Sequence, residues 1–162
     1  AEDFNGYLTH DGVTDVLAER KKSGETNQPA RELYSKHVKT VIQVGTKRTG
    51  SFNANLGYPI EIIPSQNPYK LQKGDEMAFQ VLRDGKPVAN QLVYASHGDF
   101  HGHSDDGSHE EAITTRTDAK GFGKIELIES GEWYIRLIHM VKSDKKDFDY
   151  ESNWATLTFY IQ

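Results

Sequence analysis

The sequence of 162 residues contains no cysteine. Disulfide bonds, thiolate zinc sites, iron–sulfur clusters and thiol nucleophiles are therefore excluded. The chain also lacks any apolar run near the roughly 18 residues of a membrane-spanning helix, so we expect it not to span a membrane. Basic residues are outnumbered, with 24 acidic against 19 basic side chains and a net charge of −5. No basic stripe is available to neutralise phosphates, which argues against a nucleic-acid partner.

We also expect no secretory leader within this sequence. The chain begins at Ala1 without a methionine, and we expect it to be a mature or trimmed form. Apolar residues make up only 36% of the chain, so they must be concentrated in strands if they are to form a core. The aromatic content of 10% argues against disorder. These features indicate an acidic globular domain and indicate no activity.

The first 55 residues give a mixed pattern. A short helix is predicted from about Val13 to Lys22, capped by Asp11 or Thr14 and ended by Gly24. The segment 29–45 fits both a helical stripe and an alternating strand. We favour a helical turn to about residue 36 and then a strand to residue 44.

From Leu56 onward short apolar runs alternate with turn signals. Strands are predicted at residues 59–63, 77–82, 88–95, 112–117, 122–128, 131–140 and 154–161. The turns include Asp84-Gly85, whose residue types suit the positive φ angles of a hairpin. Short strands at such spacing are typical of a mainly β, antiparallel sandwich of the transthyretin-like or immunoglobulin-like kind. We expect residues 56–162 to form this sandwich, with residues 1–55 packed on it.

The segment from Ser96 to Glu111 is rich in histidine and acidic residues. It contains four of the seven histidines. Imidazole and carboxylate groups are the ligands that zinc, nickel and copper(II) prefer, and the lack of thiolate disfavours copper(I). The candidate metal ligands in this segment are His97, Asp99, His101, His103 and His109. The alternative interpretation is a solvated loop between two strands, whose ordering around an ion would cost conformational entropy.

Two further groups are candidate site residues. His139 is a candidate ligand at the predicted end of the strand 131–140, and the alternative is a ring hydrogen-bonded at a sheet edge. Tyr150, Glu151 and Trp154 are candidate binding residues, with Glu151 as an oxygen ligand. Their alternative role is structural, with Trp154 as a core anchor.

Catalysis has little support in the sequence. Ser96 and His97 are neighbours, but no nucleophile-elbow motif surrounds them. The chain also lacks a phosphate-binding glycine loop and the H-E-x-x-H metalloprotease motif. We expect the protein not to be an enzyme, with a hydrolase using Ser96 as a remote alternative.

Several ordered phrases resemble a bacterial periplasmic family of unknown biochemical function, whose members are often described as nickel-uptake substrate-specific or nickel/cobalt transport periplasmic components. The phrases that carry the resemblance are Pro29-Ala-Arg-Glu-Leu-Tyr34, Leu56-Gly-Tyr-Pro-Ile-Glu-Ile-Ile-Pro64, Asn67-Pro-Tyr-Lys-Leu-Gln-Lys-Gly-Asp75, Thr117-Asp-Ala-Lys-Gly121, Gly131-Glu-Trp133 with His139-Met140, and Tyr150-Glu-Ser-Asn-Trp154. The resemblance implies a periplasmic or otherwise extracytoplasmic location. It also implies a further N-terminal stretch with a histidine close to an aromatic residue.

The residues and the resemblance together predict a module that binds or delivers a divalent ion: nickel, cobalt, zinc or copper(II). A membrane transporter component is the expected partner. The alternative is a metal-independent module that binds a protein or glycan through exposed aromatics, with Tyr58, Tyr69 and Phe100 as candidate contacts.

Overall fold

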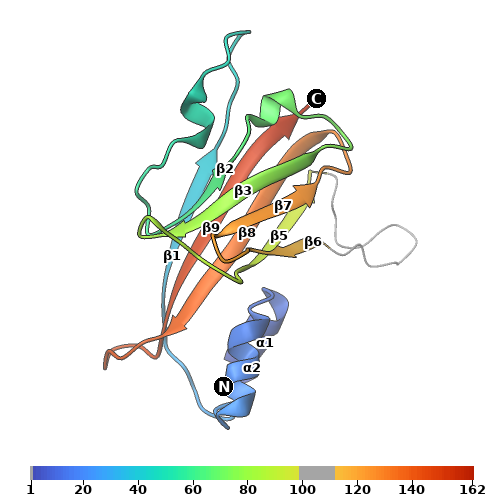
Figure 1. The fold of residues 1–162 in the computed structure, drawn as a ribbon. Coiled ribbons are helices and arrows are strands. Elements are labelled where there is room, and N and C mark those ends of the chain that lie inside the picture. Colours follow the sequence, from blue (N-terminus) through green and yellow to red (C-terminus); the bar gives the residue numbers. More distant parts are fainter. Residues whose placement is uncertain (1, 99–111) are drawn as a thin grey trace, which may run out of the picture. The chain divides into compact units, whose positions relative to one another are not determined.

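A computed structural model describes residues 2–98 and 112–162 (Figure 1). The chain is mainly β, with two sheets in a sandwich-like arrangement, as the sequence predicted. Two helices lie near the N-terminus. Among the described helices, none has the length and apolar content needed to cross a membrane.

The first sheet contains five strands in the order β1-β9-β8-β5-β6. Their bounds are β1 Glu32–Thr40, β5 Leu92–His97, β6 Ile113–Arg116, β8 Gly131–Lys142 and β9 Tyr150–Ile161. Strand β5 pairs antiparallel with both β6 and β8. Strand β1 lies parallel to β9, because the backbone bonds Tyr150 N to Arg31 O and Val41 N to Thr158 O advance in the same direction along both strands.

The second sheet contains four strands around β3. Their bounds are β2 Ile60–Pro64, β3 Glu76–Arg83, β4 Lys86–Pro87 and β7 Phe122–Glu126. All three pairings with β3 are antiparallel. The turn from β3 to β4 has positive φ at Asp84 and Gly85, as the Asp-Gly dipeptide predicted. Two short 3-10 helices, η1 Gly50–Asn53 and η2 Pro68–Lys70, lie in the connections.

One apolar core fills the sandwich. It is built by the alternating residues of β3, β8 and β9 together with shorter runs from β2, β5 and β7. Trp133 and Phe79 are its largest fully buried side chains. Burial of this apolar area, at roughly 25 cal/mol per Å², is the main stabilising term of the sandwich.

The helices are α1 Glu2–His10 and α2 Thr14–Lys22. The second confirms the predicted helix, although its N-cap Val13 makes no side-chain capping bond. It ends at Lys22 with Ser23 as its C-cap, and Gly24 follows at φ +72°, a conformation that glycine adopts without strain. The first helix was not predicted.

By contacts the chain divides into two compact units. The first unit is residues 1–35 with 138–153, and the second is residues 36–137 with 154–162. The long strands β1, β8 and β9 therefore contribute residues to both units. The core of the sandwich belongs to the second unit.

The predicted helical turn before residue 36 is wrong, because strand β1 already begins at Glu32. The apolar residues Leu33, Tyr34 and Val38, which suggested a buried helical stripe, are all more than half exposed. Strand β1 lies at the edge of its sheet, and its apolar side chains therefore do not indicate a buried face.

Candidate functional site

His97, the first histidine of the predicted ligand segment, ends strand β5 and is half-buried. It pairs in register with Trp133 of β8, and the two ring centroids lie 5.5 Å apart. The Nδ1 atom of His97 is buried and has no hydrogen-bond partner within residues 2–98 and 112–162. A buried polar atom without a hydrogen-bond partner lowers the stability of the fold by on the order of 1–3 kcal/mol. The hydrogen-bonding capacity of the His97 Nδ1 atom is thus unused.

The other residues predicted in this segment, Asp99, His101, His103 and His109, lie outside the described residues, as does Phe100. Within residues 2–98 and 112–162, no three histidine, aspartate or glutamate side chains are placed to hold a metal ion together. The ligand set of the segment therefore stays a prediction, with His97 as its one described member.

His139 is half-buried in strand β8 and belongs to the first compact unit, whereas His97 belongs to the second. The strand continues to Lys142, so His139 lies inside it and not at the predicted strand end. Its part in a metal site stays a prediction.

Ser96 is buried, with 2% of its surface exposed. It precedes His97 directly on strand β5, and successive side chains of a strand point to opposite faces. The two side chains are therefore not placed as a nucleophile and its base.

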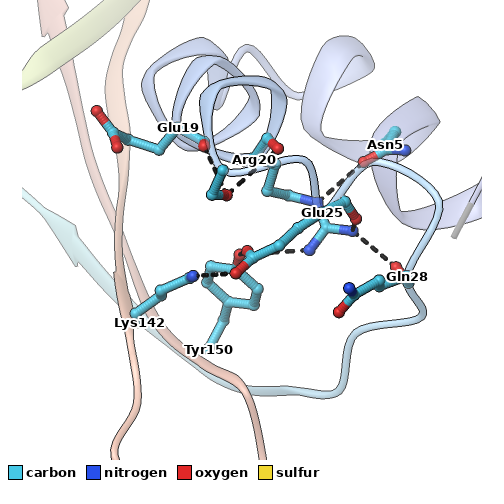
Figure 2. A network of polar contacts seen from close by, with 8 residues as sticks. Asn5, Glu19, Arg20, Glu25, Gln28, Lys142 and Tyr150 are labelled. Atoms are coloured by element: carbon cyan, nitrogen blue, oxygen red, sulfur yellow. Dashed lines mark hydrogen bonds and ion pairs between the residues drawn. The ribbon is translucent and has the colours of Figure 1, made fainter.

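Tyr150 belongs to a polar network around the buried Arg20 in the first unit (Figure 2). Its hydroxyl accepts a bond from Arg20 Nη1 at 3.3 Å and lies 3.4 Å from Glu25 Oε2. Arg20 Nη2 donates to the carbonyl oxygens of Glu25 and Gln28, both at 2.8 Å. Tyr150, which was predicted as a binding residue, thus has a structural role in this network. Its part in ligand binding stays a prediction.

A salt bridge at Glu25 extends this network. Lys142 Nζ lies 2.5 Å from Glu25 Oε1, and this ion pair lowers the pKa of Glu25 and raises that of Lys142. The guanidinium of Arg20 also lies over the ring of Phe4, 5.0 Å from its centroid. With four hydrogen bonds made and an aromatic face covered, Arg20 has little capacity left for a ligand.

The other two predicted binding residues lie further along β9. Glu151 accepts a bond from Asn153 Nδ2 at 3.4 Å. Trp154 is half-buried outside the core cluster, and the ammonium of Lys36 lies 4.4 Å from its ring centroid. The alternative of Trp154 as a core anchor is therefore wrong, because the alternation of β9 puts Ala155 and Leu157 into the core instead.

Sequence reasoning missed a buried ion pair in the second unit. Lys39 stands in a polar stretch of the sequence, yet its side chain is only 11% exposed and its Nζ lies 3.6 Å from Oε1 of Glu61. The Glu61 side chain is 2% exposed. Desolvation lowers the pKa of Lys39, and the attraction of Glu61 opposes this only in part. The sequence feature that could have indicated this ion pair is the position of Glu61 between Ile60 and Ile62 in an apolar strand.

Two cavities flank residues 40–42 in the second unit. The first, which we call the Lys39 cavity, has a volume of about 320 Å³ and is lined by Lys39, Thr40, Val41, Ile42, Gln43, Thr49, Ser51, Phe52, Ala54, Leu56 and Asn67. The second, the tyrosine cavity, has about 380 Å³ and is lined by Thr40, Val41, Ile42, Tyr69, Gly98, Glu132, Trp133, Tyr134, Thr158, Phe159 and Tyr160. Gly98 donates its N–H to Glu132 O at 2.8 Å, which fixes the tyrosine cavity beside the end of β5.

The model of a family described as a domain of unknown function (DUF4198) matches residues 4–141. No curated protein matches the chain.

Proposed function

Since the chain belongs to the DUF4198 family, whose function is unknown, we propose from its own residues that it binds a divalent metal ion through His97 and the histidine- and aspartate-rich segment that follows. The observation that carries the proposal is the buried Nδ1 of His97, which has no hydrogen-bond partner among the described residues. This nitrogen belongs to the last residue of strand β5, directly before the segment that contains the other imidazoles.

The donor set selects the class of ion. Neutral imidazole nitrogens and carboxylate oxygens suit nickel, cobalt, zinc and copper(II), whereas copper(I) prefers sulfur ligands. The ion is cargo in this proposal. The protein holds it outside the cytoplasm and delivers it to a membrane transporter component, as the resemblance noted above implies.

Calorimetry on the tag-free protein tests the proposal. We expect one of these ions to bind with a Kd below about 10 µM, since several imidazoles from one segment contribute. The double variant His101→Ala/His103→Ala should bind at least tenfold more weakly. The double variant His10→Ala/His37→Ala, which also removes two histidines but from outside the segment, should bind like the wild type. Binding weaker than 10 µM for all four ions would remove the proposal.

A second candidate, metal-independent binding of a glycan or peptide, is favoured by the tyrosine cavity. Its wall includes Tyr69, one of the aromatics predicted as a contact, together with Tyr134 and Tyr160. Tyrosine rings offer flat apolar faces with a polar tip, which suits sugar rings and peptide side chains. Under this alternative Tyr160→Ala weakens partner binding, while the His101→Ala/His103→Ala variant leaves it unchanged.

A further inference from the structure

The Lys39 cavity is lined by one charged side chain, that of Lys39, among the residues that the structure describes. The rest of its wall consists of hydroxyl, amide and apolar groups. We propose that this cavity binds a small organic carboxylate, with the ammonium of Lys39 facing the carboxylate and the apolar wall residues against the hydrocarbon part. This site is separate from the proposed metal site.

The ammonium of Lys39 is incompletely coordinated for a buried charge. An ammonium carries three N–H donors, and Nζ donates to Ala54 O at 3.2 Å. The nearest carboxylate oxygen, Glu61 Oε1, is 3.6 Å away, whereas a charge-assisted bond is about 2.7–2.9 Å long. Because only 11% of the side chain is exposed, bulk solvent compensates little of this charge. An anion entering the cavity would supply a further and closer partner for the ammonium.

Glu61 does not compete for that position. Its carboxylate accepts bonds from Leu56 N at 2.9 Å and Gly57 N at 3.3 Å, and it is not a lining residue of the cavity. The carboxylate of Glu61 is thus shared between the backbone and Lys39, and it stands behind the wall. A ligand carboxylate would meet the ammonium from the cavity side and give it a second anionic partner.

The size and the hydrogen-bond donors of the cavity narrow the choice of ligand class. A volume of about 320 Å³ is at the lower end for small-molecule sites. Ile42, Phe52 and Leu56 provide apolar surface for a short hydrocarbon body. A single ammonium without an arginine suits one negative charge, whereas a phosphate group is usually met by more donors or by a bidentate guanidinium. A monocarboxylate with a few carbon atoms matches these features.

Titration with hexanoate, followed by backbone amide NMR on the tag-free protein in EDTA, tests the proposal. We expect saturable shifts at residues 40–43 and 49–52. Hexanamide, which has the same shape without the charge, should bind at least tenfold more weakly. The Lys39→Met variant should lose hexanoate binding.

A second variant keeps the test independent of the buried ion pair. Ile42 lines the cavity and is 72% exposed, so Ile42→Glu adds a negative charge to the wall while leaving Lys39 and Glu61 in place. It should weaken hexanoate binding at least tenfold. Val44→Glu, at a position 84% exposed and outside the lining, is the matched control and should bind like the wild type.

Shifts that do not saturate, equal binding of hexanoate and hexanamide, or undiminished binding in Ile42→Glu would each overturn the proposal. In that event Lys39 and Glu61 only fasten residues 54–57 to the end of β1. The chelator keeps metal out of the experiment, so its result is distinguishable from that of the metal titration.

Discussion

Arg20 satisfies four acceptors from a position that is 2% exposed: Asn5 Oδ1, Tyr150 Oη and the carbonyl oxygens of Glu25 and Gln28. The planar guanidinium spans these groups at once, which a lysine cannot do because its donors radiate from a single atom. At the scale of single residues, the first unit therefore depends on the shape of this side chain as well as on its charge.

Arg20→Lys should lower the stability of the first unit by about 2 kcal/mol, because the partly buried carbonyl oxygens of Glu25 and Gln28 lose their shared donor. Hydrogen exchange of the amides of α2 would measure this loss. Lys21→Ala on the same helix, at an exposed position, should change it by less than about 0.5 kcal/mol. Equal effects of the two variants would contradict this role of Arg20.

Asp149 should make the first unit sensitive to acid. Arg31 donates to its carboxylate from the backbone N at 2.8 Å and from Nε at 3.3 Å, and these bonds lower the pKa of Asp149 below its ordinary value. A carboxyl group with a lowered folded-state pKa contributes stability above its unfolded pKa, and this contribution is lost as the pH falls through the folded pKa. We expect wild type to exceed Asp149→Asn in Tm at pH 6 and the difference to vanish in strong acid. A carboxyl NMR titration with its midpoint at or above about 3.9 would contradict this.

At the scale of elements, the turn before β7 allows no side chain at Gly121. This residue has φ +76°, and an added Cβ would lie 2.7 Å from Val81 O and 3.1 Å from Val88 N. Gly57 has the same φ but open space around it. Substitutions at the two glycines therefore distinguish the cost of backbone strain from the cost of a steric clash with the sheet.

Gly121→Ala should cost roughly 1–2 kcal/mol for the left-handed conformation plus a further cost for displacing the backbone of β3. Gly57→Ala should cost only the first part. Urea unfolding followed by tryptophan fluorescence would compare the two variants. If Gly57→Ala is destabilised as much as Gly121→Ala, the close contact at Gly121 contributes nothing.

Elements with a strong local signal were predictable from the sequence. The hairpin at Asp84-Gly85 and the alternation of β3 and β8 follow directly from residue types. Helix α1 was missed because Asn5 and Gly6 have poor helix propensity. Its stability comes from tertiary bonds, such as that of Asn5 Nδ2 to Thr26 O at 2.7 Å, which no local pattern reveals.

A candidate site could be predicted from the sequence only where its potential ligand residues lie in one short segment. The histidine segment is visible because its residues adjoin in sequence. The Lys39 cavity combines β1, η1 and Asn67, and the burial of Lys39 depends on the fold bringing Glu61 to it. An isolated lysine in a polar stretch looks solvated until the strand pairings are known.

At the scale of the whole molecule, metal binding should stabilise the fold through linkage. A ligand that binds only the folded state adds about 2.7 kcal/mol at a free concentration of 100 times its Kd. We expect Tm to rise with nickel, cobalt, zinc or copper(II) at pH 7.5. The rise should shrink as the pH falls through about 6.5, because protonated imidazole does not bind metal.

A rise in Tm that is equal at pH 5 and pH 7.5 would exclude histidine as the main ligand. The His101→Ala/His103→Ala variant is the control, and its Tm should respond weakly to metal at both pH values. A variant response as large as that of the wild type would place the ion elsewhere.

Imidazole nitrogen NMR on histidine-labelled protein with one equivalent of zinc tests the central claim most directly. We expect the ring nitrogens of His97 and of at least two among His101, His103 and His109 to shift together, saturating at one ion per chain. Unchanged His97 nitrogens at that stoichiometry, or shifts spread equally over all seven histidines, would contradict a metal site at the end of β5.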